Sequence, residues 1–203
     1  MARIKNAPAP AVGDEAPDFN LSSAQGGGLR LGVRTVRGPV VVAFFGGTWS
    51  GDDVAFFEAL AGKEDEINAA LGSVVGVCVS EPEAAREFQK KVGLKSYVLY
   101  DYTMTATAAW GVLEESAEHG PHARSATFLV DGERRVAAAW PDARPVPDEL
   151  LAAVSGITGL PKPEEPAGET ADGEEGAEGK PARPRRTTRR AKKETEGEEG
   201  SGE

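Results

Sequence analysis

Residues 39–45, PVVVAFF, form an unbroken apolar run that is dense in valine. Runs of this length and composition are typical of a central strand that is buried on both faces. A glycine-rich turn over residues 46–51, GGTWSG, follows the run, and a helical pattern begins directly after it. We therefore expect the fold to be organised around this strand and the helix that follows its turn.

The helix behind the turn is indicated by apolar residues that recur at helical spacing from Val54 to Leu71. Ser50, with an acidic residue three positions later at Asp53, fits the sequence signature of a helix N-terminus. We expect the helix to end at Gly72, because glycine is favoured just beyond the last turn.

The remaining elements alternate between strand and helix. The predicted bounds are an N-terminal hairpin of 18–21 and 29–31, a strand at 73–80, a helix at 82–92, a strand at 97–100, a short helix at 103–110, a polar loop at 114–123, strands at 126–130 and 135–140, and a helix at 147–154. Such alternation implies a partly parallel sheet with helices on both faces. We predict an α/β protein with a thioredoxin-like fold, in which an N-terminal β-hairpin joins a central mixed sheet and a hairpin and helix close the chain.

The composition divides the chain into three parts. No large apolar residue follows Leu160, so residues 161–203 have no apolar surface to bury, and we predict a disordered charged tail. Residues 1–9 are predicted to be a loose N-terminus and residues 10–158 to form the folded domain. The net charge is −10, and the tail has 12 acidic and 9 basic residues, which leaves −7 for the rest. A mildly acidic domain argues against nucleic-acid binding by its folded face.

The sequence also excludes several classes of site. Cys78 is the only cysteine, so no intramolecular disulfide can form. No Cys/His cluster has zinc spacing, and nothing indicates a metal or a cofactor. The first residues are not followed by the apolar run of a signal peptide, and no stretch reaches the ~18 apolar residues of a membrane helix. We therefore expect a cytoplasmic protein without a membrane partner.

Four segments resemble peroxiredoxins of the alkyl hydroperoxide reductase and thiol-specific antioxidant (AhpC/TSA, redoxin) family. They are GDEAPDFNL at 13–21, VVVAFF at 40–45, VVGVCVS at 74–80 and TFLVDG at 127–132. The resemblance covers about residues 10–155. It implies a thioredoxin fold and, from the fold alone, an antioxidant thiol oxidoreductase that reduces peroxides.

The reactive loop departs from the pattern of that family, Pro-x-x-x-Thr-x-x-Cys. The proline of the pattern falls on Gly46, the threonine on Ser50 and the cysteine on Asp53. The Trp-Cys-x-x-Cys motif of thioredoxins, aligned on Trp49, also places its second cysteine at Asp53. A peroxidase needs a sulfur nucleophile that can pass through sulfenic acid, and a carboxylate cannot do so. The positive end of a helix nevertheless favours any anion, including this carboxylate.

The arginine of the family pattern, Arg-x-Thr-Phe, is also displaced. Arg124 precedes Thr127 by three residues, which is one too many. Because a slip of one residue in a strand reverses the face of a side chain, Arg124 reaches the site only if a bulge absorbs the extra residue. No residue is assigned a catalytic role. The positions equivalent to the active site are Gly46, Trp49, Ser50, Asp53 and Arg124.

Other candidate residues have a structural interpretation beside a functional one. Cys78 is either a second redox thiol or, among valines in a strand, a small buried apolar residue. Asp52 and Asp53 are either ligands for a cation or the acidic start of a helix. His119 and His122 lie in the predicted polar loop without an evident partner. Trp49 either recognises a partner or packs at the base of its loop.

Three functions remain open from the sequence. The first is a peroxiredoxin-like protein without thiol peroxidase activity, which acts as a binding or scaffolding module with a protein partner at the active-site-equivalent loop. The second is an oxidoreductase that uses Cys78 or a thiol of a partner. The third is an adaptor that binds a polyanion through residues 183–193, RPRRTTRRAKK, which carry seven bases. A homodimer is compatible with each of them.

Overall fold

The computed structural model describes residues 4–160, and within them seven strands form one mixed sheet. In spatial order the strands are β2 (Gly28–Arg30), β1 (Asn20–Ser23), β5 (Tyr97–Tyr100), β4 (Ser73–Cys78), β3 (Val40–Phe44), β8 (Ala126–Val130) and β9 (Val136–Trp140). Two further strands, β6 (Leu113–Ser116) and β7 (Gly120–Ala123), pair only with each other. The predicted N-terminal hairpin is confirmed as β1 and β2, which are antiparallel.

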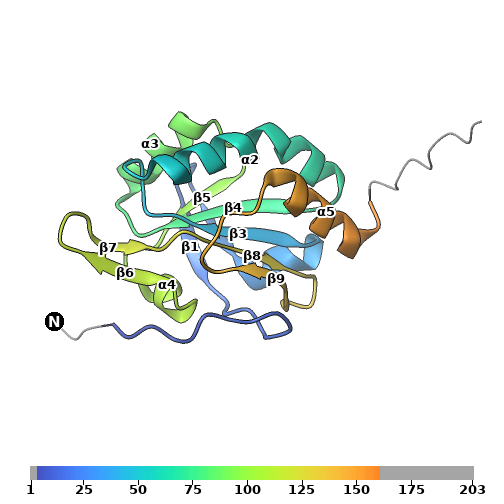
Figure 1. Ribbon diagram of the computed structural model, residues 1–203, viewed down its shortest axis with the longest axis horizontal. Helices are drawn as coiled ribbons and strands as arrows, with labels where there is room; N and C mark the ends of the chain where they lie inside the picture. Colours follow the sequence, from blue (N-terminus) through green and yellow to red (C-terminus); the bar gives the residue numbers. More distant parts are fainter. Residues whose placement is uncertain (1–3, 161–203) are drawn as a thin grey trace, which may run out of the picture. The chain divides into compact units, whose positions relative to one another are not determined.

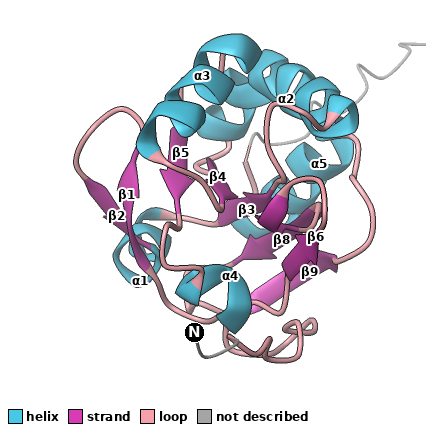
Figure 2. Ribbon diagram, turned by 90° about the vertical axis from the view of Figure 1, so that its left-hand side faces the viewer, coloured by secondary structure: helices cyan, strands magenta, loops and turns pink. Residues whose placement is uncertain are grey.

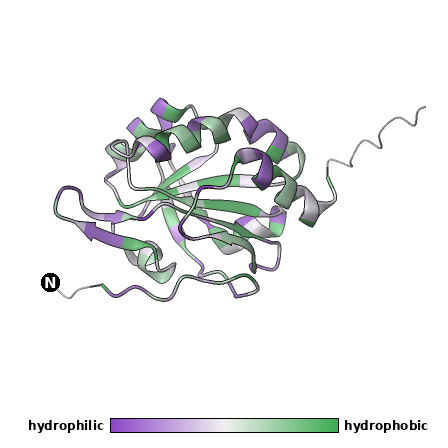
Figure 3. Ribbon diagram, in the orientation of Figure 1, coloured by the Kyte–Doolittle hydropathy of each residue, from purple (hydrophilic) through white to green (hydrophobic). Residues whose placement is uncertain are grey.

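The valine-rich run forms the centre of the sheet as predicted. β3 lies between β4, to which it is parallel, and β8, to which it is antiparallel, and all five of its residues are buried. Side chains alternate between the two faces of a strand. Val41 and Ala43 therefore belong to one hydrophobic core, and Val40 and Phe44 belong to the other. Figure 3 shows the central strands largely in the colour of hydrophobic residues.

Helices cover both faces of the sheet, which confirms the predicted α/β architecture (Figures 1 and 2). One core is closed by α2 (Gly51–Ala69), α3 (Pro82–Val92) and α5 (Pro147–Thr158). The other core includes residues of the short helices α1 (Leu31–Arg34) and α4 (Thr105–Ala109), and a 3-10 turn, η1 (Thr35–Arg37), follows α1. No helix among residues 4–160 has the length and apolar character needed to cross a bilayer.

The first long helix begins as the sequence indicates and ends earlier than expected. The Ser50 hydroxyl accepts a hydrogen bond from the Asp53 backbone N–H at 3.3 Å, so Ser50 is the N-cap of α2. The helix stops at Ala69, three residues before the predicted end at Gly72. A Cβ atom at Gly72 would lie 2.7 Å from the Val154 side chain of α5. This glycine therefore permits close packing of the chain against α5.

The prediction of a polar loop at 114–123 is wrong, because this segment forms the β6–β7 hairpin. Leu113 pairs with Ala123, and Ser116 pairs with Gly120. The segment is polar and contains Gly120 and Pro121, which are typical of turns, so its sequence does not show the alternation of a strand. Proline is tolerated here since β6 and β7 are both edge strands of a two-stranded sheet.

The N-terminal segment is attached to the domain. The Asn6 side chain exchanges two hydrogen bonds with the backbone of Leu113, at 2.7 and 3.3 Å. The Ala7 N–H donates to the Ala108 carbonyl at 2.9 Å. Residues 6 and 7 therefore lie against the β6 and α4 region, although we predicted that residues 1–9 form a loose N-terminus. The predicted tail, residues 161–203, lies outside the described residues, and so does the basic segment 183–193.

Candidate functional site

The site lies where the turn after β3 enters α2. Asp52 and Asp53 both occupy the first turn of this helix, yet only Asp53 is buried, with 1% of its surface exposed. The backbone N–H of Asp53 is bonded to the Ser50 cap, and its side chain lies against the loop, where it meets the Gly46 N–H. The positive end of the helix dipole favours a carboxylate at this place.

Three groups from different parts of the fold donate hydrogen bonds to the Asp53 carboxylate. The Gly46 backbone N–H donates to Oδ2 at 2.9 Å. The Ser125 hydroxyl donates to Oδ1 at 2.6 Å, and the Arg144 guanidinium donates to the same oxygen. Arg144 also forms an ion pair with this carboxylate. Asp53 is therefore held by partners from its own loop, from the start of β8 and from the loop before α5.

Arg144 joins the elements around the carboxylate. Its side chain is 14% exposed and donates to the Phe44 carbonyl at 2.5 Å and to the Ala126 carbonyl at 3.2 Å. The guanidinium carbon lies 4.5 Å from the centre of the Phe56 ring, which is a cation–π distance. Burial lowers the pKa of Arg144, and the negative charge of Asp53 acts in the opposite direction. Because an arginine stays protonated in proteins, Arg144 keeps its positive charge beside Asp53.

The predicted arginine, Arg124, does not reach the Asp53 carboxylate. It forms ion pairs with Asp142 and with Glu114, the latter at 3.5 Å, although it lies along the same cavity as Asp53. The register shift at this edge of the sheet lies between Leu129 and Val130, beyond the point where it could absorb the extra residue. Two positions before Thr127, where the family pattern places its arginine, the chain has Ser125.

The sequence indicated Arg124 as the arginine of the site and did not indicate Arg144. Ser125 donates its hydroxyl proton to Asp53, and the cation of the site comes from Arg144 instead. Arg144 lies in the loop between β9 and α5, and no motif surrounds it. The sequence carried no local signal for its role, because its hydrogen-bond partners are 17 to 100 residues away along the chain.

Trp49 forms a wall of the site beside the glycines. A Cβ atom at Gly46 would lie 2.6 Å from the indole ring, and one at Gly47 would lie 2.8 Å from it. The ring stacks on the His119 imidazole with 3.7 Å between centroids, and the His122 ring meets it edge-on at 5.3 Å. The expectation that the histidines have no partner is therefore wrong. Their contacts with Trp49 attach the β6–β7 hairpin to the loop.

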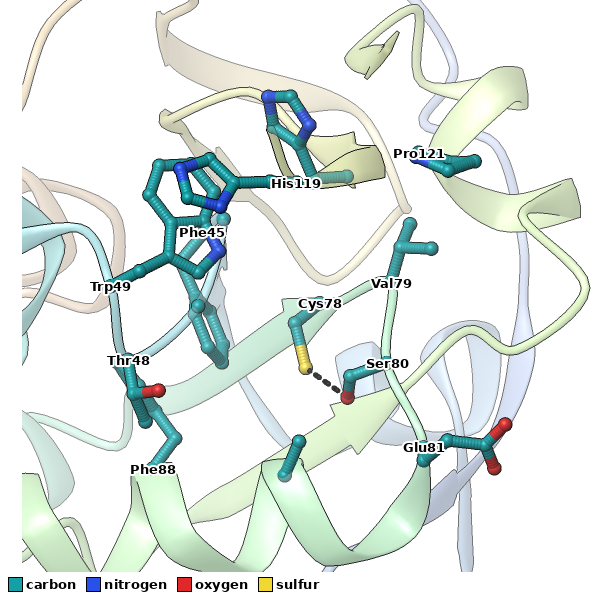
Figure 4. A pocket seen from close by; sticks show the side chains of 14 residues that line it. Phe45, Thr48, Trp49, Cys78, Val79, Ser80, Glu81, Phe88, His119 and Pro121 are labelled. Atoms are coloured by element: carbon teal, nitrogen blue, oxygen red, sulfur yellow. Dashed lines mark hydrogen bonds between the residues drawn. The ribbon is translucent and has the colours of Figure 1, made fainter. Parts of the chain in front are cut away.

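Cys78 lies in a neighbouring cavity of about 260 Å³ (Figure 4). The thiol is at the end of β4, is 1% exposed, and lies 3.1 Å from the Ser80 hydroxyl. Burial raises the pKa of Cys78 to about 12, the Ser80 hydrogen bond lowers it, and the charge of Asp101 raises it. The structural interpretation of Cys78 as a core residue agrees with its place in the hydrophobic core beneath α2 and α3.

The cavity of Cys78 and the cavity of Asp53 are adjacent and separate. The Asp53 cavity has a volume of about 320 Å³. Gly46, Trp49 and His122 line both cavities. All five predicted positions line the Asp53 cavity, namely Gly46, Trp49, Ser50, Asp53 and Arg124. Within residues 4–160, no three His, Cys, Asp or Glu side chains are placed to hold a metal ion together.

Several solved structures that share this fold are named as peroxiredoxins. Peroxidoxin BcpB from Mycobacterium tuberculosis superposes with a TM-score of 0.64 at 24% identity, covering 73% of this chain and 98% of that one. A cysteine-to-serine mutant of PrxQ from Xylella fastidiosa gives 0.63 at 18% identity, covering 74% and 98%. The reduced 2-Cys peroxiredoxin of Plasmodium vivax gives 0.63 at 19% identity, covering 73% and 82%.

At these identities the superpositions establish the fold. No curated protein matches the sequence significantly. The model of the AhpC/TSA family, however, matches residues 12–139, which is more than half of the chain. The segments that resemble peroxiredoxins, the mixed sheet with helices on both faces and this match together show that the chain belongs to the AhpC/TSA family.

Proposed function

We propose that this member of the AhpC/TSA family does not reduce peroxides by thiol chemistry, and that its active-site-equivalent loop binds a partner instead. The proposal places Asp53 at the position of the reactive cysteine. The observation that carries it is the buried carboxylate at the first turn of α2, bonded to Gly46, Ser125 and Arg144.

The surroundings of Asp53 suit a carboxylate rather than a reactive thiol. A thiol peroxidase needs a thiolate that attacks the peroxide oxygen and becomes a sulfenic acid. The Asp53 carboxylate accepts three hydrogen bonds, and its ion pair with Arg144 neutralises its charge. A carboxylate held in this way stabilises the loop. It is not the sulfur nucleophile that peroxide reduction requires.

Cys78 is a weak candidate to replace the missing thiol. With a pKa of about 12, only about one thiol in 10⁵ is ionised at pH 7. The side chain is also 1% exposed and lies in the core beneath α3. Both properties disfavour the alternative in which the chain reduces peroxides through Cys78.

A binding role is supported by the surface of the loop. Trp49 is 47% exposed, although it is large and apolar. It separates two cavities that open beside it. Tryptophan is enriched among the residues that contribute most of the binding energy at protein interfaces.

Peroxide consumption tests the loss of activity. The full chain should give only background turnover of hydrogen peroxide with thioredoxin and its reductase, or with a small thiol as reductant. Asp53→Cys should show a weak gain, because Arg144 remains beside the new thiol. Asp52→Cys is the matched control, since it adds an exposed thiol one residue away, and it should show no gain.

Two results would overturn the proposal. Wild-type turnover comparable to that of an authentic peroxiredoxin would show that another group supplies the chemistry. Equal activity of Asp52→Cys and Asp53→Cys would show that position 53 is not the reactive position of this fold.

A further inference from the structure

The cavity in Figure 4 adjoins a third cavity, of about 210 Å³. The two share Val79, Ser80, Glu81 and Pro121, and together we call them the groove. The groove therefore runs from Trp49, past the segment that follows β4, to Tyr102, which is 65% exposed. Both ends of the groove carry an exposed aromatic side chain.

The deep part of the groove is apolar and small. Phe45 and Phe88 are stacked with 3.9 Å between ring centroids, and both line this part. Its volume, about 260 Å³, is below the roughly 300–1,000 Å³ that is usual for sites of drug-sized ligands. A single large apolar side chain is the size of occupant that such a cavity accommodates.

One carboxylate, Glu81, lines both cavities of the groove, just before α3 begins. The β6–β7 hairpin lines the groove through His119, Pro121 and His122, and it carries no lysine or arginine among residues 113–123. An acidic side chain at the mouth of an apolar cavity complements an apolar side chain with a basic neighbour.

Among the described residues, no lysine or arginine lines either cavity of the groove. Arg124 pairs with Glu114 and Asp142, and Arg86 pairs with Glu83. The Lys91 ammonium donates to the Thr48 carbonyl at 3.4 Å. Glu81 has no ion-pair partner among residues 4–160, and it lies at the junction of the two cavities.

We propose that this groove binds a segment of a partner protein in which one large apolar side chain is flanked by lysine or arginine residues. The inference rests on the proposed function, because it assigns a chemistry to the partner of that loop. The apolar side chain enters the cavity over Cys78, and a basic side chain beside it lies against Glu81. Burial of the apolar side chain supplies affinity, and the charges supply orientation and a faster encounter.

The test uses fluorescence anisotropy of labelled peptides with the full chain. The first peptide has a central leucine flanked by arginines, the second has serine in place of leucine, and the third has glutamates in place of the arginines. A peptide with the sequence of residues 183–193 is a further control, because it has seven bases and no large apolar residue. The first peptide should bind at least about tenfold more tightly than the serine peptide and the 183–193 peptide, since neither has a large apolar side chain to bury. It should bind at least about twofold more tightly than the glutamate peptide, because that peptide places acidic residues beside Glu81.

Two variants locate the site, and circular dichroism checks that each is folded. Ala84→Trp fills the cavity from an exposed position on α3, so it should abolish binding of the first peptide without disturbing the core. Glu81→Lys should weaken binding about twofold to fivefold at low salt. Glu58→Lys is the matched control, because Glu58 is exposed on α2 and lines none of these cavities, and it should leave binding unchanged.

Several outcomes would overturn the inference. Equal affinity for the leucine and serine peptides would refute the apolar anchor, and equal affinity for the basic and acidic peptides would refute the charge argument. Binding unaffected by Ala84→Trp would place the peptide elsewhere. Dimerisation of the chain that the leucine peptide reverses, seen by sedimentation, would make a second copy the occupant. Peroxide turnover of the same preparation tests the proposed function separately, since activity and peptide binding can each fail alone.

Discussion

The contrast between the two arginines gives a quantitative prediction. Arg144→Ala should lower the free energy of unfolding by about 3–5 kcal/mol, because it leaves the buried Asp53 carboxylate without its counter-charge. Arg124→Ala should lower it by less than about 1 kcal/mol, since its partners Asp142 and Glu114 are 78% and 51% exposed. A domain with a total stability of about 5–15 kcal/mol would show the first change clearly.

Equilibrium unfolding in urea, followed by circular dichroism, measures both changes. A double-mutant cycle with Asp53→Ala isolates the pair. The double variant Asp53→Ala/Arg144→Ala should be more stable than the sum of the two single changes predicts, by about 0.5–3 kcal/mol, because no charge is then left buried alone. Equal losses for Arg144→Ala and Arg124→Ala, or a coupling energy near zero, would refute this account of the site.

Two further predictions concern Cys78 and Trp49. Because burial raises the pKa of Cys78 from 9.0 to about 12, the unfolded chain loses this proton first as the pH rises. The free energy of unfolding should therefore fall above about pH 9, by up to about 1.4 kcal/mol per pH unit. Urea unfolding of Cys78→Ala should show a smaller fall. Identical slopes for the two proteins would contradict the burial of the thiol. Gly46→Ala should displace the indole of Trp49, because the new Cβ would lie 2.6 Å from it. In proton NMR the ring signals of His119, which stacks on Trp49, should then move downfield, whereas Gly62→Ala, which meets nothing within 4 Å, should leave them in place.

The sequence predicted the elements whose signals are local. The valine-rich β3 is recognisable because every one of its residues is buried. The start of α2 follows from Ser50 and Asp53, which bond to each other three residues apart. α3 was predicted at its observed bounds, since Pro82 begins it and Gly93, with a φ of 70°, ends it.

The parts that the sequence did not predict depend on contacts between distant segments. The β6–β7 hairpin contains Gly120 and Pro121, which are typical of turns, so its pairing was not apparent. Arg144 contacts Asp53 across 91 residues, and no periodic pattern reports such a contact. The stack of His119 on Trp49 needs the hairpin to be placed beside the loop, which is a property of the assembled fold.

The position of the single cysteine has a consequence for how the molecule responds to its surroundings. With its one sulfhydryl group in the interior, the chain can form no bridge within itself, and an oxidant has little access to that group. We therefore expect the domain to keep the same covalent structure in reducing and in oxidising conditions.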